Sequence, residues 1–96
     1  MPAFFIADIR IHDPDGYQGY LAGFMEIFER YHGKLRVVSS ATVEVIEGDW
    51  SPNGLVVMEF PTVEQAKAWL NDPDYVELAK IRKTTAETNL VFVPGL

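Results

Sequence analysis

Near the middle of the chain, an uninterrupted apolar run, Leu-Val-Val-Met, begins at residue 55 directly after turn residues. An apolar run bounded by turn residues predicts a strand that is covered on both faces. Thr62 is followed three positions later by Gln65, and this spacing is a capping-box signature. The pattern therefore predicts a strand over residues 55–60 and a helix over residues 63–70.

The first segment alternates in the way that strand side chains do, which predicts a strand over residues 3–11. One face of this strand is wholly apolar, and we expect it to lie under helices; it comprises Phe5, Ala7, Ile9 and Ile11. The opposite face starts apolar and becomes charged, with Phe4, Ile6, Asp8 and Arg10.

A helix is predicted next, with Asp13 as its N-cap and Pro14 at the first helical position. Gly33 is expected to end it as a left-handed C-cap. Glycines inside this segment weaken its helix propensity, so burial of an apolar stripe must stabilise it. The stripe follows helical spacing and comprises Tyr17, Tyr20, Leu21, Phe24, Phe28 and Tyr31.

The remaining segments alternate between strand and helix patterns. Residues 35–46 predict a second strand, with a bulge near Ser39-Ser40 where the alternation breaks, and residues 47–54 predict a loop. Asp72 followed by Pro73 repeats the cap-then-proline start of a helix. That last helix would carry Tyr75, Leu78, Ala79 and Arg82 on one side. Residues 90–93 predict the final strand.

This β-α-β-β-α-β order predicts one α+β domain over residues 1–96, a ferredoxin-like, four-stranded antiparallel sheet with helices on one face. Both faces of the first and third strands are largely apolar, so the face without helices would be too apolar for a monomer in water. We therefore expect an obligate homodimer, a dimeric α+β barrel, in which two such faces pack together.

Composition narrows the functional classes. The 96 residues carry a net charge of −6, which opposes binding to nucleic acid or to an anionic membrane. The chain has no cysteine, so disulfides, thiolate metal sites and cysteine nucleophiles are excluded. The apolar run at the N-terminus is too short for a signal peptide or a membrane span. We expect a soluble cytoplasmic protein without a bound metal or cofactor.

Several segments also carry a family likeness: Tyr31-x-Gly33, residues 43–50 (VEVIEGDW), residues 56–62 (VVMEFPT), Ala68-Trp69, residues 72–75 (DPDY) and residues 78–82. Together they resemble the domain of unknown function 1330 family. The resemblance implies a ferredoxin-like fold of the dimeric α+β barrel superfamily, which is similar in fold to cofactor-free monooxygenases, haem-degrading enzymes and muconolactone isomerases. A shared fold does not determine function. The family usually has a second glycine at the position of His32, and an Arg-Gly-Gly at residues 38–40.

Three charged residues form the first candidate site. Strand parity places Asp8 and Arg10 on the face opposite the helices, and it places Glu59 on the same face of a neighbouring strand. If they meet, they form a polar pocket for a small ligand, in which burial would raise the pKa of Glu59 and make it a general base. The alternative is an ion pair between Arg10 and a carboxylate, which neutralises charge at the dimer interface.

Three further residues are weaker candidates. His32 could act as a base at the mouth of a pocket. Glu26, Glu29 and His32 also share one helix face, as half of a di-iron site would, but this face is better explained as a polar surface exposed to water. Trp50 would need apolar cover, either in the dimer interface or over the mouth of the barrel. Arg82 would hold a substrate anion or would stack on the surface with Tyr75.

Two hypotheses for function follow. In the first, the protein is a small homodimer that binds a small organic molecule inside the barrel and turns it over without a cofactor. In the second, it is a non-catalytic binding or structural module whose interior is filled by side chains. A cavity of about 300 Å³ or more would favour the first, and a close-packed interior would favour the second.

Overall fold

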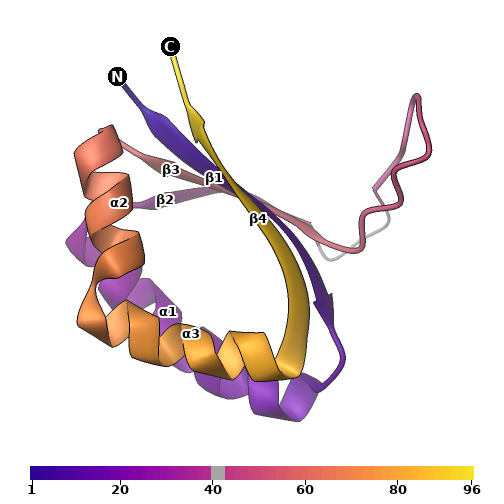
Figure 1. Cartoon of the computed structure of the whole chain (residues 1–96), viewed down its shortest axis with the longest axis horizontal. Coiled ribbons are helices and arrows are strands. Elements are labelled where there is room, and N and C mark those ends of the chain that lie inside the picture. Colours follow the sequence, from indigo (N-terminus) through magenta and orange to yellow (C-terminus); the bar gives the residue numbers. More distant parts are fainter. Residues whose placement is uncertain (40–42) are drawn as a thin grey trace.

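A computed structural model of the chain describes residues 1–39 and 43–96. The elements follow in the order β1 (Ala3–Ile11), α1 (Pro14–Arg30), β2 (Lys34–Val38), β3 (Leu55–Phe60), α2 (Val63–Asn71), α3 (Pro73–Thr85) and β4 (Ala86–Pro94). The three helices lie together on one side of a curved sheet, and the two termini lie beside each other (Figure 1).

All strand pairs are antiparallel, and the order across the sheet is β2-β3-β1-β4. The predicted ferredoxin-like architecture is confirmed. Because strand side chains alternate, Phe5 and its pairing partners Met58 and Phe92 face the helices. The opposite face, here called the open face, carries side chains from all four strands, including Phe4, Ile6, Val37, Leu55, Val57, Val91 and Val93.

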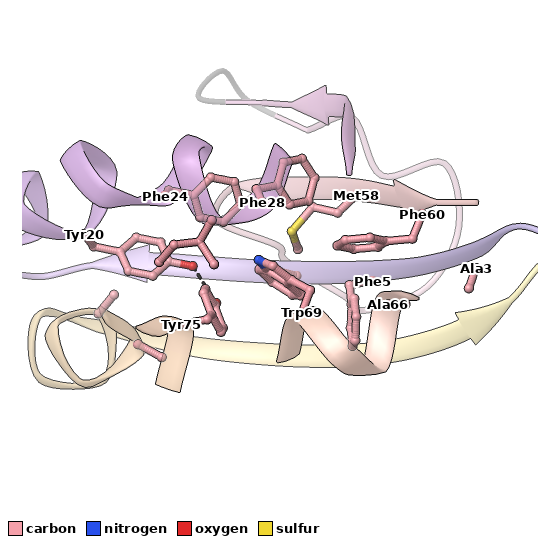
Figure 2. Packing of buried hydrophobic residues seen from close by; sticks show 14 of the residues in the cluster. Ala3, Phe5, Tyr20, Phe24, Phe28, Met58, Phe60, Ala66, Trp69 and Tyr75 are labelled. Carbon is pink, nitrogen blue, oxygen red and sulfur yellow. Dashed lines mark hydrogen bonds between the residues drawn. The ribbon is translucent and has the colours of Figure 1, made fainter. Parts of the chain in front are cut away.

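The core between the helices and the sheet is built from aromatic rings (Figure 2). Trp69 of α2 is fully buried at its centre. Its ring centroid lies 4.1 Å from that of Tyr75 and 5.4 Å from that of Phe5. Phe28 and Phe60 are also fully buried and meet edge to face at 5.2 Å. This ring cluster holds α1 and α2 against β1 and β3, because each buried ring removes a large apolar area from water.

The helix starts are the predicted ones. Asp13 accepts a hydrogen bond from Gly16 N at 3.1 Å, and Thr62 accepts one from Gln65 N at 3.1 Å. Asp72 caps α3 by accepting from Asp74 N at 2.7 Å. Each cap pairs a backbone N–H group that would otherwise lack a partner in the first helical turn.

The end of α1 differs from the prediction. The positive φ, +61°, belongs to His32 and not to Gly33. His32 N donates to Glu29 O and Gly33 N donates to Phe28 O, which is the hydrogen-bond pattern of a Schellman motif. Gly33 is required for another reason: a Cβ atom there would lie 2.5 Å from the Phe28 ring.

Two strands also have different bounds. β2 ends at Val38, far short of residue 46, and its register shifts between Leu35 and Val37, whereas the predicted bulge lay at Ser39-Ser40. Ser40 lies outside the described residues. β4 begins at Ala86, where α3 ends, whereas the predicted final strand began at residue 90. Residues 43–52 project from the sheet away from the helices (Figure 1). In the described ranges, no helix is long and apolar enough to cross a membrane.

Candidate functional site

A cavity of about 580 Å³ lies between α1 and the helix-facing side of the sheet. Most of its lining is apolar and comes from one face of α1 and from β1, β2 and β3. The lining residues are Ile9, Arg10, Ile11, Tyr17, Tyr20, Leu21, Phe24, Leu35, Val38, Ser39, Asn53, Gly54, Val56 and Met58. This volume exceeds the value of about 300 Å³ that favours the small-molecule hypothesis, and the space lies between the helices and the sheet.

The wall formed by α1 is aromatic and carries two buried phenol groups. Tyr17 and Tyr20 are each 5% exposed, and their ring centroids lie 5.3 Å apart. The Tyr20 hydroxyl shares a hydrogen bond of 2.7 Å with the Tyr75 hydroxyl (Figure 2). Burial raises the pKa of Tyr20 well above the usual phenol value, and the neighbouring Tyr75 hydroxyl adds to the rise. Burial also raises the pKa of Tyr17, so both rings stay neutral near pH 7.

Arg82 lies behind this aromatic wall. It is 8% exposed, and its guanidinium carbon lies 5.7 Å from the centroid of the Tyr20 ring. Burial by itself lowers the pKa of Arg82, but the nearby hydroxyl groups of Tyr75 and Tyr20 outweigh that effect and the net change is upward. The prediction that Tyr75 and Arg82 share one side of the last helix is correct, but that side is buried and Arg82 is no surface residue.

The segment before β3 closes one end of the cavity. Ile9 N donates to Gly54 O at 2.9 Å, and Asn53 N donates to the Asp8 carboxylate at 2.9 Å. These bonds hold residues 53–54 against β1. Arg10 also lies at this end, and it forms an exposed ion pair with Glu87 at 3.9 Å.

The predicted meeting of Asp8, Arg10 and Glu59 does not occur. Asp8 pairs with Leu55, whereas Glu59 pairs with Phe4, four residues away along β1. At about 3.3 Å per residue, this separates the two carboxylates by roughly 13 Å along the strand. Glu59 lies on the open face, as strand parity predicted, but its partner is Arg36, with Arg36 Nε 2.8 Å from Glu59 Oε1. Arg10, for which the alternative was an ion pair at the dimer interface, pairs instead with Glu87, and both side chains are exposed.

The other candidates lie outside the cavity. His32 is exposed at the end of α1, and Trp50 is 57% exposed in the projecting segment. Across residues 1–39 and 43–96, no group of three or more histidines and carboxylates is placed to hold a metal ion. None of the described residues that line the cavity is a histidine, an aspartate or a glutamate.

The lining residues Tyr17, Tyr20 and Phe24 were predicted only as a core stripe. Their spacing correctly predicts one buried helix face, but spacing does not tell a close-packed face from the wall of a cavity. The available signal was chemical, because a buried tyrosine needs a partner for its hydroxyl group. Two tyrosines in one buried stripe therefore indicate a polar element within an apolar site.

The fold places the protein among ferredoxin-like α+β proteins. The chain belongs to the family described as Domain of unknown function (DUF1330), whose family model matches residues 2–96. No curated protein matches the chain.

Solved structures share the fold at low sequence identity. A protein of unknown function from Rhodopseudomonas palustris is 21% identical, with a TM-score of 0.78 over 99% of this chain and 82% of that one. SnoaB, a cofactor-independent oxygenase from Streptomyces nogalater, is 12% identical, with a TM-score of 0.68 over 99% and 93%. A dimeric protein of unknown function with a ferredoxin-like fold from Bacteroides fragilis is 14% identical, with a TM-score of 0.61 over 98% and 96%.

Proposed function

We propose that the protein is a homodimer that binds a small, largely apolar organic molecule in the cavity between α1 and the sheet. The observation that carries this proposal is the cavity itself, about 580 Å³ in volume. Ligand sites of small molecules range from about 300 to 1,000 Å³, are mostly apolar, and contain a few polar groups that orient the ligand. A structural module with a filled interior would not leave this space, because protein interiors normally pack closely.

The lining favours a planar aromatic ligand. Tyr17, Tyr20 and Phe24 present rings along one wall, and aromatic pairs gain energy beyond the apolar area that they bury. Asn53 lies at the end of the cavity that residues 53–54 close, where it can orient an oxygen-bearing edge of the ligand. The Tyr17 and Tyr20 phenols stay protonated near pH 7, so they are suited to recognition and not to proton abstraction.

SnoaB is a cofactor-independent oxygenase with the same fold, and this fits a protein that acts on an organic ligand without added groups. At 12% identity the likeness extends to the fold alone. Binding is therefore the function proposed for this chain. Glu59 and His32 remain candidates for catalysis only if a ligand also reaches the open face or the end of α1.

The open face supports the homodimer. Val91 is 53% exposed and Val37 is 45% exposed, and both lie among further apolar side chains of the sheet. Exposed apolar area of this kind is costly in water and typically marks a contact surface. The Bacteroides fragilis protein with this fold is dimeric, which fits two sheets packed face to face. Trp50 and Ile46 (80% exposed) in the projecting segment would gain cover in the same assembly.

Filling the cavity tests the proposed function. Leu21→Trp adds an indole ring at the cavity wall on a residue that is 51% exposed, so α1 should tolerate the change. The wild-type protein is expected to show a rise in melting temperature with 1-naphthol or related small aromatic molecules, since a ligand that binds only the folded state stabilises it. Leu21→Trp is expected to weaken this binding by about tenfold or more, because the ring takes the ligand's space.

Met25→Trp is the matched control. Met25 lies one turn further along α1, is 42% exposed, and does not line the cavity. It should keep the wild-type response. If no small aromatic molecule raises the melting temperature, or if Leu21→Trp responds as the wild type does, the cavity is not the binding site.

A further inference from the structure

Arg82 differs from the other three arginines in having no carboxylate partner. Arg10, Arg30 and Arg36 have side chains that are between 41% and 68% exposed, and each forms an ion pair with an aspartate or glutamate. Arg82 is 8% exposed, and it forms no ion pair with any described residue. A buried guanidinium normally needs an anion, because leaving water is costly for an unpaired charge. The ring of Tyr20 and the tyrosine hydroxyls meet only part of this need.

A second pocket opens beside Arg82, where α3 passes into β4. Its volume is about 590 Å³, and it is lined by Arg82, Lys83, Ala86, Glu87, Thr88 and Leu90. These residues differ from the ones that line the cavity under α1. The hydroxyl of Thr88 is buried and has no hydrogen-bond partner among the described residues. A buried guanidinium without an anionic partner and a hydroxyl without a hydrogen-bond partner therefore belong to the residues that line one pocket.

The charges around this pocket favour an anion. Lys83 forms no ion pair with a described residue, so it adds a second unpaired positive charge to that of Arg82. The acidic residue of the lining, Glu87, pairs with Arg10 at 3.9 Å. A protein with a net charge of −6 thus keeps a local excess of positive charge at this pocket. Ala86 and Leu90 supply an apolar floor for the uncharged part of a ligand.

We propose that the pocket between α3 and β4 binds the oxyanion group, a carboxylate or a phosphate, of a small molecule. The Arg82 guanidinium provides the charge-assisted hydrogen bonds, for which its planar fork suits both groups. Lys83 adds long-range attraction. The Thr88 hydroxyl gains an acceptor through a change of its χ1 rotamer, which exchanges the positions of its hydroxyl and methyl groups. This site is separate from the cavity of the proposed function and does not depend on it.

The test is a titration of the ¹⁵N-labelled protein with sodium phosphate, and separately with sodium acetate, at constant ionic strength maintained with chloride. Amide resonances of residues 82–90 are expected to shift and to saturate. Arg82→Met is expected to weaken binding by about tenfold or more, and Thr88→Val by about threefold, as expected for loss of a charged and of a neutral hydrogen bond. The stronger of the two anions identifies the group that the site prefers.

Lys80→Met is the matched control, because it removes a positive charge from the exposed side of α3 outside the pocket, where Lys80 pairs with Glu77. It should bind as the wild type does. If Arg82→Met does not fold, Thr88→Val and Lys83→Met decide the matter, since both change the pocket wall at less buried positions. The proposal is overturned if neither anion produces saturable shifts, if the shifts spread over basic residues elsewhere, or if all variants bind equally.

Discussion

The hydroxyl groups of Tyr20 and Tyr75 meet between α1 and α3 at 2.7 Å, within a core of aromatic and aliphatic side chains. The bond fixes the Tyr20 ring as part of the cavity wall. It also makes the ring sensitive to pH, because a phenolate cannot be accommodated there. Burial, together with Tyr75, keeps the pKa of Tyr20 above its ordinary value.

Tyr20→Phe should therefore change the alkaline limb of the stability profile. The folded state holds the Tyr20 proton more tightly than the unfolded state, so this contribution is complete below about pH 10 and is lost as the pH rises further. Replacement by phenylalanine should cost about 1 kcal/mol near neutral pH through the lost hydrogen bond. It should also make the decline above pH 10 shallower. Melting temperatures from neutral to alkaline pH measure both effects.

The neutral range supplies the internal control, since no proton is released from either state of Tyr20 there and the two profiles should run parallel. A Tyr20→Phe profile that falls as steeply as the wild type above pH 10 would show that burial does not hold this proton.

At the scale of single elements, two neighbouring residues at the end of α1 are constrained in different ways: His32 by its backbone conformation and Gly33 by the space around its Cα atom. His32 adopts a left-handed backbone conformation at φ +61°, which costs an L-residue about 1 kcal/mol or more. Gly33 has no such requirement, but it lies under the Phe28 ring. His32→Gly is expected to raise the free energy of unfolding by about 0.5 kcal/mol. Relief of the backbone strain stabilises the folded state, and the larger conformational entropy of glycine in the unfolded chain offsets part of that gain.

Gly33→Ala serves as the contrasting variant, and it should destabilise the protein by about 1–3 kcal/mol because its Cβ overlaps a fully buried ring. Denaturant unfolding measures the free energy of unfolding of each variant, which should rise for His32→Gly and fall for Gly33→Ala. If His32→Gly destabilises and Gly33→Ala is neutral, the assignment of strain to His32 is wrong.

Local signals explain which elements the sequence predicted well. Asp13-Pro14, Thr62 with Gln65, and Asp72-Pro73 each act within a few residues, and all three helices begin where these signals lie. β4 was predicted too short because α3 continues into it without a turn residue, and its first residues, such as Glu87 and Asn89, read as polar loop. Their strand pairing with β1 is a long-range effect that no local pattern contains.

At the scale of the whole molecule, sequence patterns predicted both layers but not the space between them. Strand parity assigned Glu59 to the open face, yet the antiparallel register that separates it from Asp8 depends on where β1 and β3 pair. The aromatic stripe of α1 predicted a buried face, but no local pattern contains the distance at which α1 lies above the sheet. The cavity follows from that spacing and not from any motif.

Val91→Lys tests the proposed dimer. Val91 lies on the open face opposite Ile6 of β1, so a lysine there would place a charge inside the interface of two packed sheets. Removing a charged amine from water without a partner is costly, and we expect the dimer to dissociate at least about a hundredfold more readily. Light scattering after size exclusion should give twice the chain mass of 10.8 kDa for the wild type and a mass near 10.8 kDa for the variant.

Val76→Lys is the matched control. Val76 on α3 is 48% exposed, which is close to the 53% of Val91, but only Val91 lies on the open face. The control should remain a dimer, because the same added charge stays in water. A wild-type protein that is monomeric at micromolar concentration would refute the assembly outright. If the Val76→Lys variant is a monomer and the Val91→Lys variant is a dimer, the dimer interface lies on the helices and not on the open face of the sheet.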